Sequence, residues 1–249
     1  MPTVRFKGRV LPETQKISIG PKPNIQWQET AKNLSMDFIC NIENSLVDIQ
    51  CSLNRWEEEF LPDLYRRALD LSRASVELVG FAKGCALSVC LDSFIDHEGI
   101  EKKLHLEDQS LSALCTAFNL ECDFDVVQTL VLQEPGLFMA LHDLIEAISI
   151  PHASLVNCAR CVERIKHLLA STGQSEKQAW TKMRTTLMID ESYIRYVTDN
   201  SKDSRHGRGS YVDGTVTTEV TRRAWSILDR YLHYKKNGDM LPANTSNLS

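Results

Sequence analysis

The stretch MDFICNIENSLVDIQCSLNRWEEEFLPDLYRRALDLSRASVELVGFAK, residues 36–83, contains the change of hydrophobic period that decides the fold. Over residues 36–53 apolar side chains alternate with polar ones, which predicts an antiparallel β-hairpin with one solvent-facing side and a turn at Asn44-Ser45. From Glu57 to about Lys83 the apolar residues recur at helical intervals, which predicts one long amphipathic helix. We expect this helix to bury the apolar side of the hairpin.

The segments on either side of this stretch extend the predicted sheet. VRFKGRV (residues 4–10) and KISIG (residues 16–20) alternate apolar and polar side chains, as strands with one wet face do. CALSVCLDSFI (residues 85–95) alternates again and is expected to return as a further strand. The polar, glycine-containing segment 96–110 is the predicted linker.

Beyond this linker the apolar residues keep helical spacing. The predicted fold class is therefore α+β: a small antiparallel β-rich N-terminal region packed on a long helix, followed by an all-α helical bundle. The predicted organisation is a β-rich domain over residues 1–106, a bundle over residues 107–238 and a flexible tail over residues 239–249. Helices of the bundle are predicted over 110–120, 124–133, 135–149, 152–171, 175–189, 190–200 and 216–236.

The sequence predicts a soluble cytoplasmic protein without a membrane partner. It begins MPTVRFKGRV, which lacks the apolar core of a secretory signal. No stretch approaches the roughly 18 uninterrupted apolar residues that a membrane span needs. The common phosphate-binding, nucleophile-elbow, HExxH and dinucleotide-binding motifs are missing too, which argues against the usual hydrolases and kinases.

The eight cysteines lie mostly in apolar surroundings, which predicts reduced, buried thiols. Cys158 and Cys161 form a CxxC pair with His152 and His167 on either side. Three interpretations are open for these residues: a zinc site, a redox pair or ordinary helix packing. A zinc site would require four ligands to converge from one predicted helix. We expect packing, and therefore no metal site and no cofactor.

Charge is distributed unevenly along the chain. Residues 91–149 contain twelve acidic and two basic side chains, whereas residues 150–236 contain fifteen basic and nine acidic ones. The basic part has two possible partners: a nucleic acid, or the acidic segment of the same chain. We favour the second, which requires no ligand.

Polar chemistry concentrates in YVTDNSKDSRHGRGSYVDGTVTTEV, residues 196–220, a break between two apolar-periodic segments. A histidine titrates near neutral pH, and an arginine holds a phosphodiester by paired hydrogen bonds. His206 is therefore a candidate acid/base, and Arg205 or Arg195 a candidate phosphate ligand, for metal-independent cleavage of RNA. The alternative is that Arg205 and His206 bond to carbonyl groups at the end of a helix while the neighbouring glycines form the turn.

A helix that ends in Asn200-x5-His206-Gly207 and is followed by a loop and a final amphipathic helix resembles the closing half of HEPN domains. The resemblance covers about residues 140–238, and the whole chain resembles uncharacterised bacterial proteins. It implies a small helical bundle that pairs into dimers and belongs to a bacterial defence or stress system. Active HEPN domains cleave RNA with an arginine directly before the polar residue, and here that position is Asp199. The departure from the motif implies a bundle that does not catalyse.

Simpler interpretations exist for two further pairs of residues and for the tryptophans. Arg160 and His167 match the spacing of the HEPN motif, but such a match is expected by chance, and a solvated helix edge explains it equally. His142 and Glu146 share a helix face and are possible metal ligands, although they lack identified partners. Three tryptophans lie on predicted helices among apolar neighbours and are expected in the core: Trp56, Trp180 and Trp225.

We therefore expect a non-catalytic interaction or scaffold protein with a homodimeric or other protein partner. Two alternatives remain. One is a metal-independent endoribonuclease that uses His206, Arg205, Asn200 and Arg195, and the other is an RNA- or DNA-binding protein that does not cleave.

Overall fold

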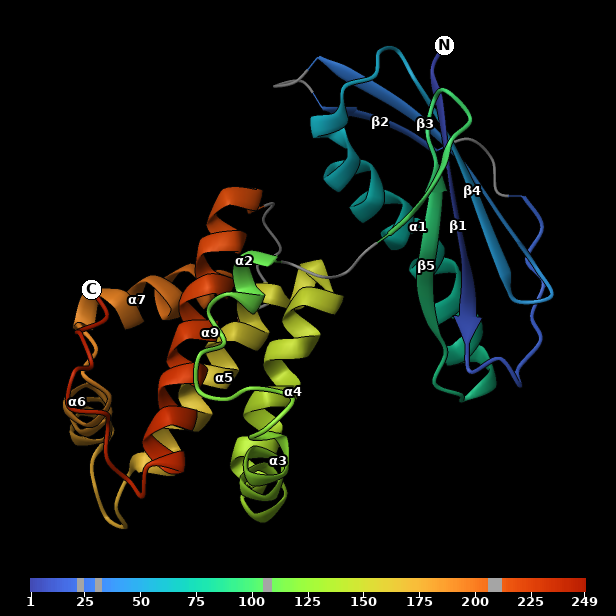
Figure 1. Cartoon of the computed structure of the whole chain (residues 1–249). Coiled ribbons are helices and arrows are strands. Elements are labelled where there is room, and N and C mark those ends of the chain that lie inside the picture. Colours follow the sequence, from blue (N-terminus) through green and yellow to red (C-terminus); the bar gives the residue numbers. More distant parts are fainter. Residues whose placement is uncertain (22–24, 30–32, 105–108, 206–211) are drawn as a thin grey trace. The chain divides into compact units, whose positions relative to one another are not determined.

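The computed structural model describes residues 1–21, 25–29, 33–104, 109–205 and 212–249 (Figure 1). The chain divides into two compact units, Met1–Leu106 and Glu107–Ser249, each with a hydrophobic core of its own. Among the described residues the first unit contains an antiparallel sheet and the second is helical. The predicted α+β fold class is confirmed.

Six described strands form the sheet of the first unit in the order β2-β3-β4-β1-β5-β6, and each neighbouring pair is antiparallel. The predicted hairpin is confirmed as β3 and β4, in which Cys40 stands opposite Ile49. The strands are β1 Thr3–Leu11, β2 Ile25–Glu29, β3 Leu34–Glu43, β4 Leu46–Leu53, β5 Ser88–Ile95 and β6 Glu101–Lys103.

Helix α1, Leu61–Lys83, follows the short helix η2, Glu58–Phe60, and contacts β1, β3, β4 and β5 (Figure 1). Its apolar stripe, which includes Leu64, Ala68 and Val76, is fully buried against the sheet. The helix ends at Gly84, whose φ of 62° lies in the left-handed region that glycine adopts without steric cost. The predicted long helix over the hairpin is confirmed.

Gly8 is required where β1 and β5 approach each other. The register of the two strands shifts between Lys7 and Gly8. A Cβ atom on Gly8 would lie 2.1 Å from the carbonyl oxygen of Cys90, which is too close for any side chain. The register shift between β1 and β5 therefore requires glycine at this position.

The predicted strand over KISIG is wrong. Ile19 forms a single bridge with Ile42, and the rest of the segment is not extended into a strand. The hydroxyl of Ser45 accepts a hydrogen bond from the Ile17 N–H at 3.1 Å and donates one to the Gln15 carbonyl at 2.7 Å. These contacts use backbone groups that a strand would share with a neighbouring strand.

The predicted linker contains strand β6. The carboxylate of Asp96 accepts hydrogen bonds from the N–H groups of Glu98 and Ile100 at 3.0 and 2.9 Å, and these bonds form the turn between β5 and β6. The strand is short and all its side chains are charged and exposed, so no apolar alternation marks it in the sequence.

Helix α5 is central to the second unit and contacts α4, α6, α7, α8 and α9 (Figure 1). The longer predicted helices are confirmed, with shifts of a few residues at their ends. The helices are α2 Gln109–Ser112, α3 Phe124–Gln133, α4 Pro135–Ser149, η3 Pro151–Ala153, α5 Ser154–Leu169, α6 Glu176–Leu187, α7 Glu191–Asn200, α8 Lys202–Arg205 and α9 Gly214–Lys236.

Cys158 and Cys161 are completely buried on α5. Burial raises the pKa of both thiols, to about 11 for Cys158, whose Sγ lies 3.6 Å from the hydroxyl of Thr221 on α9. A buried thiol with a raised pKa stays protonated and is a poor nucleophile. Both cysteines pack between helices, as the sequence analysis favoured.

The C-terminal residues, expected as a flexible tail, are instead bonded to the turn between α6 and α7. The N–H of Leu248 donates to the carbonyl of Met188 at 3.0 Å, and the N–H of Asp190 donates to the carbonyl of Leu248 at 2.9 Å. The Arg230 guanidinium on α9 donates to the Ser246 carbonyl at 2.8 Å. These long-range contacts leave no periodic signal in a polar sequence, so composition alone suggested a loose end.

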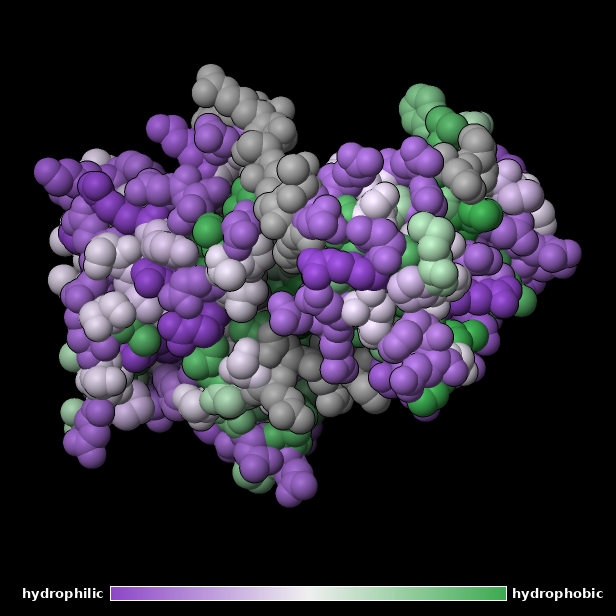
Figure 2. All heavy atoms as spheres, turned by 90° about the horizontal axis from the view of Figure 1, so that it is seen from above, coloured by the Kyte–Doolittle hydropathy of each residue, from purple (hydrophilic) through white to green (hydrophobic). Residues whose placement is uncertain are grey.

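None of the described helices is long and apolar enough to cross a membrane. Hydrophilic residues cover most of the face shown in Figure 2, and hydrophobic residues appear there in smaller patches.

Candidate functional site

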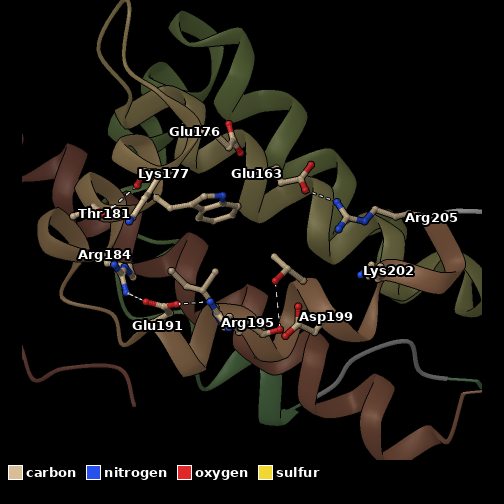
Figure 3. Close-up of a pocket in the computed structure, with 13 residues that line it drawn as sticks. Glu163, Glu176, Lys177, Thr181, Arg184, Glu191, Arg195, Asp199, Lys202 and Arg205 are labelled. Atoms are coloured by element: carbon tan, nitrogen blue, oxygen red, sulfur yellow. Dashed lines mark hydrogen bonds and ion pairs between the residues drawn. The ribbon is translucent and has the colours of Figure 1, made fainter.

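The second unit contains a pocket of about 880 Å³ between helices α6 and α7, which is bounded at one end by α8 and by a residue of α5 (Figure 3). We call it the α6–α7 pocket. Its volume falls in the range of small-molecule sites, roughly 300–1,000 Å³. It is lined by Glu163, Glu176, Lys177, Trp180, Thr181, Arg184, Glu191, Ile194, Arg195, Thr198, Asp199, Lys202 and Arg205.

Helical spacing brings these side chains to the pocket. On α6, Lys177, Trp180 and Arg184 stand at positions i, i+3 and i+7, which share one face of a helix. On α7, Glu191 and Ile194 stand at i and i+3 and face the pocket in the same way. The two walls are therefore each one stripe of an amphipathic helix.

A capping box fixes the start of α6. The hydroxyl of Ser175 accepts a hydrogen bond from the N–H of Gln178 at 3.4 Å, and the side-chain oxygen of Gln178 accepts one from the N–H of Ser175 at 2.9 Å. Because this cap defines where the first turn begins, it also sets the direction in which Lys177 and Trp180 project.

Ion pairs join the walls of the pocket, as the dashed lines in Figure 3 show. The carboxylate of Glu191 on α7 pairs with Arg184 on α6 and, at 2.7 Å, with Arg195 one turn along α7. Glu163 on α5 pairs with Arg205 on α8. Arg184 and Arg205 join different helices, whereas Arg195 pairs within α7, and an incoming anion has to compete with a carboxylate for all three.

Trp180 lines the pocket and also meets a buried cation. The Nζ atom of Lys166 on α5 lies 4.6 Å from the centre of the Trp180 ring, and the Lys166 side chain is only 3% exposed. Lys166 pairs with Glu176, and its hydrogen bond is the main cause that lowers the pKa of the Glu176 carboxyl. A charged lysine is tolerated here because a carboxylate and an aromatic ring both contact it.

Several polar groups at the pocket lack partners among the described residues. Lys177, Lys202 and Asp199 form no ion pair or side-chain hydrogen bond there. The Nε atom of Arg184 is buried and has no hydrogen-bond partner in the described part of the chain. Buried donors normally have a partner, so this one is an unsatisfied polar group in the wall of the pocket.

The structure brings part of the predicted catalytic set together. Arg195 and Arg205 line the same pocket, at the end near α8 in the case of Arg205 (Figure 3). Asn200 does not line it, and its amide donates to the carbonyl of Tyr196 at 2.7 Å. His206, the predicted acid/base, lies outside the described residues.

The other candidates are not part of this site. Arg160 lies 3.6 Å from the carboxylate of Asp143 on α4, and His167 is an exposed residue of α5 that does not line the pocket. Asp143, between the possible metal ligands His142 and Glu146, is buried and also pairs with Arg164 at 2.5 Å. In the part of the chain that the structure describes, no three metal-ligating side chains come together.

Sequence reasoning missed Trp180 as a pocket residue. Trp180 does pack against the core of the second unit, as predicted, but it also reaches the pocket. The signal was present in its neighbours, because Lys177 and Arg184 share its helix face and a wholly buried stripe would not carry them.

Both units match domains of one protein family. Residues 4–104 match the N-terminal domain, and residues 124–236 the C-terminal domain, of a family described as "Domain of unknown function (DUF8168)". The two domains follow each other in this order over most of the chain, which therefore belongs to the DUF8168 family. No curated protein and no solved structure matches the chain.

Proposed function

We propose that this chain is a non-catalytic interaction protein whose HEPN-like helical unit pairs with a second copy of the chain. The observation that carries the proposal is a set of exposed apolar side chains on α3 and α4. On α4, Phe138 and Ile145 are 50% and 43% exposed, and their spacing of seven residues puts them on one helix face. Large exposed apolar side chains that gather in one place mark contact surfaces.

Helix α3, which contacts α4, also carries exposed apolar side chains. Phe124 and Leu132 are 45% and 71% exposed, and Leu120, just before the helix, is 72% exposed. Hydrophobic burial is worth about 25 cal/mol for each Å² removed from water, so covering several such side chains supports a stable contact.

The charge pairs of the α6–α7 pocket also favour a role without catalysis. Arg205 and Arg195 are bonded to Glu163 and Glu191, and the Asn200 amide is bonded to backbone. Each arginine already has a carboxylate partner, which weakens its attraction for a phosphodiester.

Light scattering coupled to size-exclusion chromatography tests the proposal on the full chain. The wild type is expected to be a dimer, and Phe138→Asp and Ile145→Asp are each expected to shift it to a monomer, because a buried charge without a partner is costly. Phe81→Asp is the matched control, since Phe81 is 88% exposed on α1 in the first unit. A wild type that stays monomeric, or a dimer that neither α4 variant weakens, contradicts the proposal.

The second candidate function is a metal-independent endoribonuclease. It is favoured by one observation: Arg195 and Arg205 line the same pocket, and His206 follows Arg205 directly in the sequence. Total RNA incubated with the protein in the presence of a chelator would then be degraded, and His206→Ala would stop the reaction while the control His167→Ala would not. RNA that survives rules this candidate out. A salt-dependent mobility shift without cleavage would instead support nucleic-acid binding.

A further inference from the structure

We propose that the α6–α7 pocket binds a small anion that carries a flat aromatic ring, with the ring against Trp180 and the acid group in the field of Lys177 and Lys202. This site goes beyond the proposed contact on α3 and α4, and neither depends on the other.

The aromatic half of the ligand follows from the apolar lining. Trp180 on α6 and Ile194 on α7 both line the pocket. Aromatic side chains prefer offset or edge-to-face contact with another ring, and small-molecule sites combine such apolar surface with a few polar groups. Because charged side chains surround this apolar strip, a flat ring fits it better than a bulky apolar group does.

The anionic half follows from the balance of charge. Five basic and four acidic residues line the pocket, and buried Lys166 adds a further positive charge beside Trp180. The glutamates are already neutralised by Arg184, Arg195, Arg205 and Lys166. Two lysines therefore remain without a partner among the described residues, against Asp199 alone, and the local field favours an anion.

Isothermal titration of the full chain at low salt tests the pairing of ring and charge. Indole-3-acetate supplies a ring with a carboxylate, and adenosine 5′-monophosphate supplies a ring with a phosphate. Indole, acetate and inorganic phosphate supply one half each. At least one of the two complete ligands is expected to bind at least tenfold more tightly than each of its halves.

Variants assign the binding to this pocket. Trp180→Leu and the double variant Lys177→Gln/Lys202→Gln are each expected to weaken the complete ligand at least fivefold. Trp180→Phe, which keeps a ring, is expected to stay within threefold of the wild type and guards against a loss that reflects folding alone. Lys182→Gln is the charge control, because Lys182 lies on α6 but does not line the pocket.

The outcomes separate the sources of the ligand. Binding of indole-3-acetate alone identifies an aryl carboxylate, and binding of the nucleotide alone identifies a phosphate-bearing ring; either result supports the proposal. No binding of either complete ligand at millimolar concentration overturns it. Equal binding of indole removes the anionic half, and an unchanged affinity in both pocket variants moves the site elsewhere.

Discussion

Lys166 is a buried cation whose charge is balanced by two different kinds of contact. Its side chain is 3% exposed, it pairs with Glu176, and its ammonium lies near the ring of Trp180. The partner carboxylate is 65% exposed, so water screens part of the attraction. The pair therefore links the core of the second unit to the wall of the pocket.

Removing the charge of Glu176 is expected to lower the free energy of unfolding more than replacing the buried Lys166 does. Glu176→Gln leaves Lys166 buried without a counter-charge, and we expect it to lower the free energy of unfolding by about 1–2 kcal/mol after allowance for solvent. Lys166→Met keeps the packing and removes the buried charge, so its effect is expected to stay within about 1 kcal/mol. Urea denaturation measures both. If Lys166→Met proves less stable than Glu176→Gln, the ion pair stabilises the folded chain by more than we expect.

The same pair makes stability depend on pH. The pKa of Glu176 is lowered in the folded chain, chiefly by the hydrogen bond from Lys166. Its stabilising contribution is therefore complete above the ordinary glutamate pKa of 4.5 and is lost as the pH falls through the lowered folded value. The difference in unfolding free energy between wild type and Glu176→Gln should thus shrink on going from pH 7 to pH 3. A difference that stays constant would show that Glu176 acts without its charge.

At the scale of elements, the cap of α6 positions one wall of the pocket. Ser175→Ala removes the acceptor for the N–H of Gln178, and we expect it to lower the unfolding free energy by about 1 kcal/mol. Thr185→Ala is the control, because the Thr185 hydroxyl bonds to carbonyl groups inside the same helix and caps nothing. Denaturation of both variants by urea should separate them, and equal effects would mean that the cap contributes nothing special.

The elements also show where sequence reasoning succeeds. Alternation identified β3 and β4, and the helical stripe of Leu64, Ala68 and Val76 identified α1, because burial on one side imposes those periods. KISIG failed because only Ile19 forms a bridge with β3, while the Ile17 N–H bonds to the Ser45 side chain, which no local pattern reveals. Strand β6 was missed because its side chains are all charged and exposed.

The candidate site could be predicted only in part. The polar break led to Arg195 and Arg205, and both line the pocket. Their carboxylate partners come from α5 and α7, and the pairing of Arg205 with Glu163 spans 42 residues, so it depends on how the helices pack. Trp180 was assigned to the core alone, since a tryptophan on an amphipathic helix normally packs there.

At the scale of the whole molecule, the two units have separate hydrophobic cores. Phe6 is completely buried in the first core and Leu144 almost completely in the second. Phe6→Ala is expected to destabilise the first unit by about 3–5 kcal/mol, and Leu144→Ala the second by about 2–5 kcal/mol. Hydrogen exchange followed by mass spectrometry resolves peptides from each unit. Each variant should speed exchange in its own unit and not in the other, whereas exchange that rises throughout the chain would reveal one cooperative fold.

The backbone ladder between Leu248 and the turn at Met188–Asp190 ties the last residues to the corner that joins α6 and α7. Removal of Leu248 and the residues beside it would therefore delete both of these backbone hydrogen bonds. Without these two hydrogen bonds, the angle between α6 and α7, the helices that enclose the pocket, becomes easier to change.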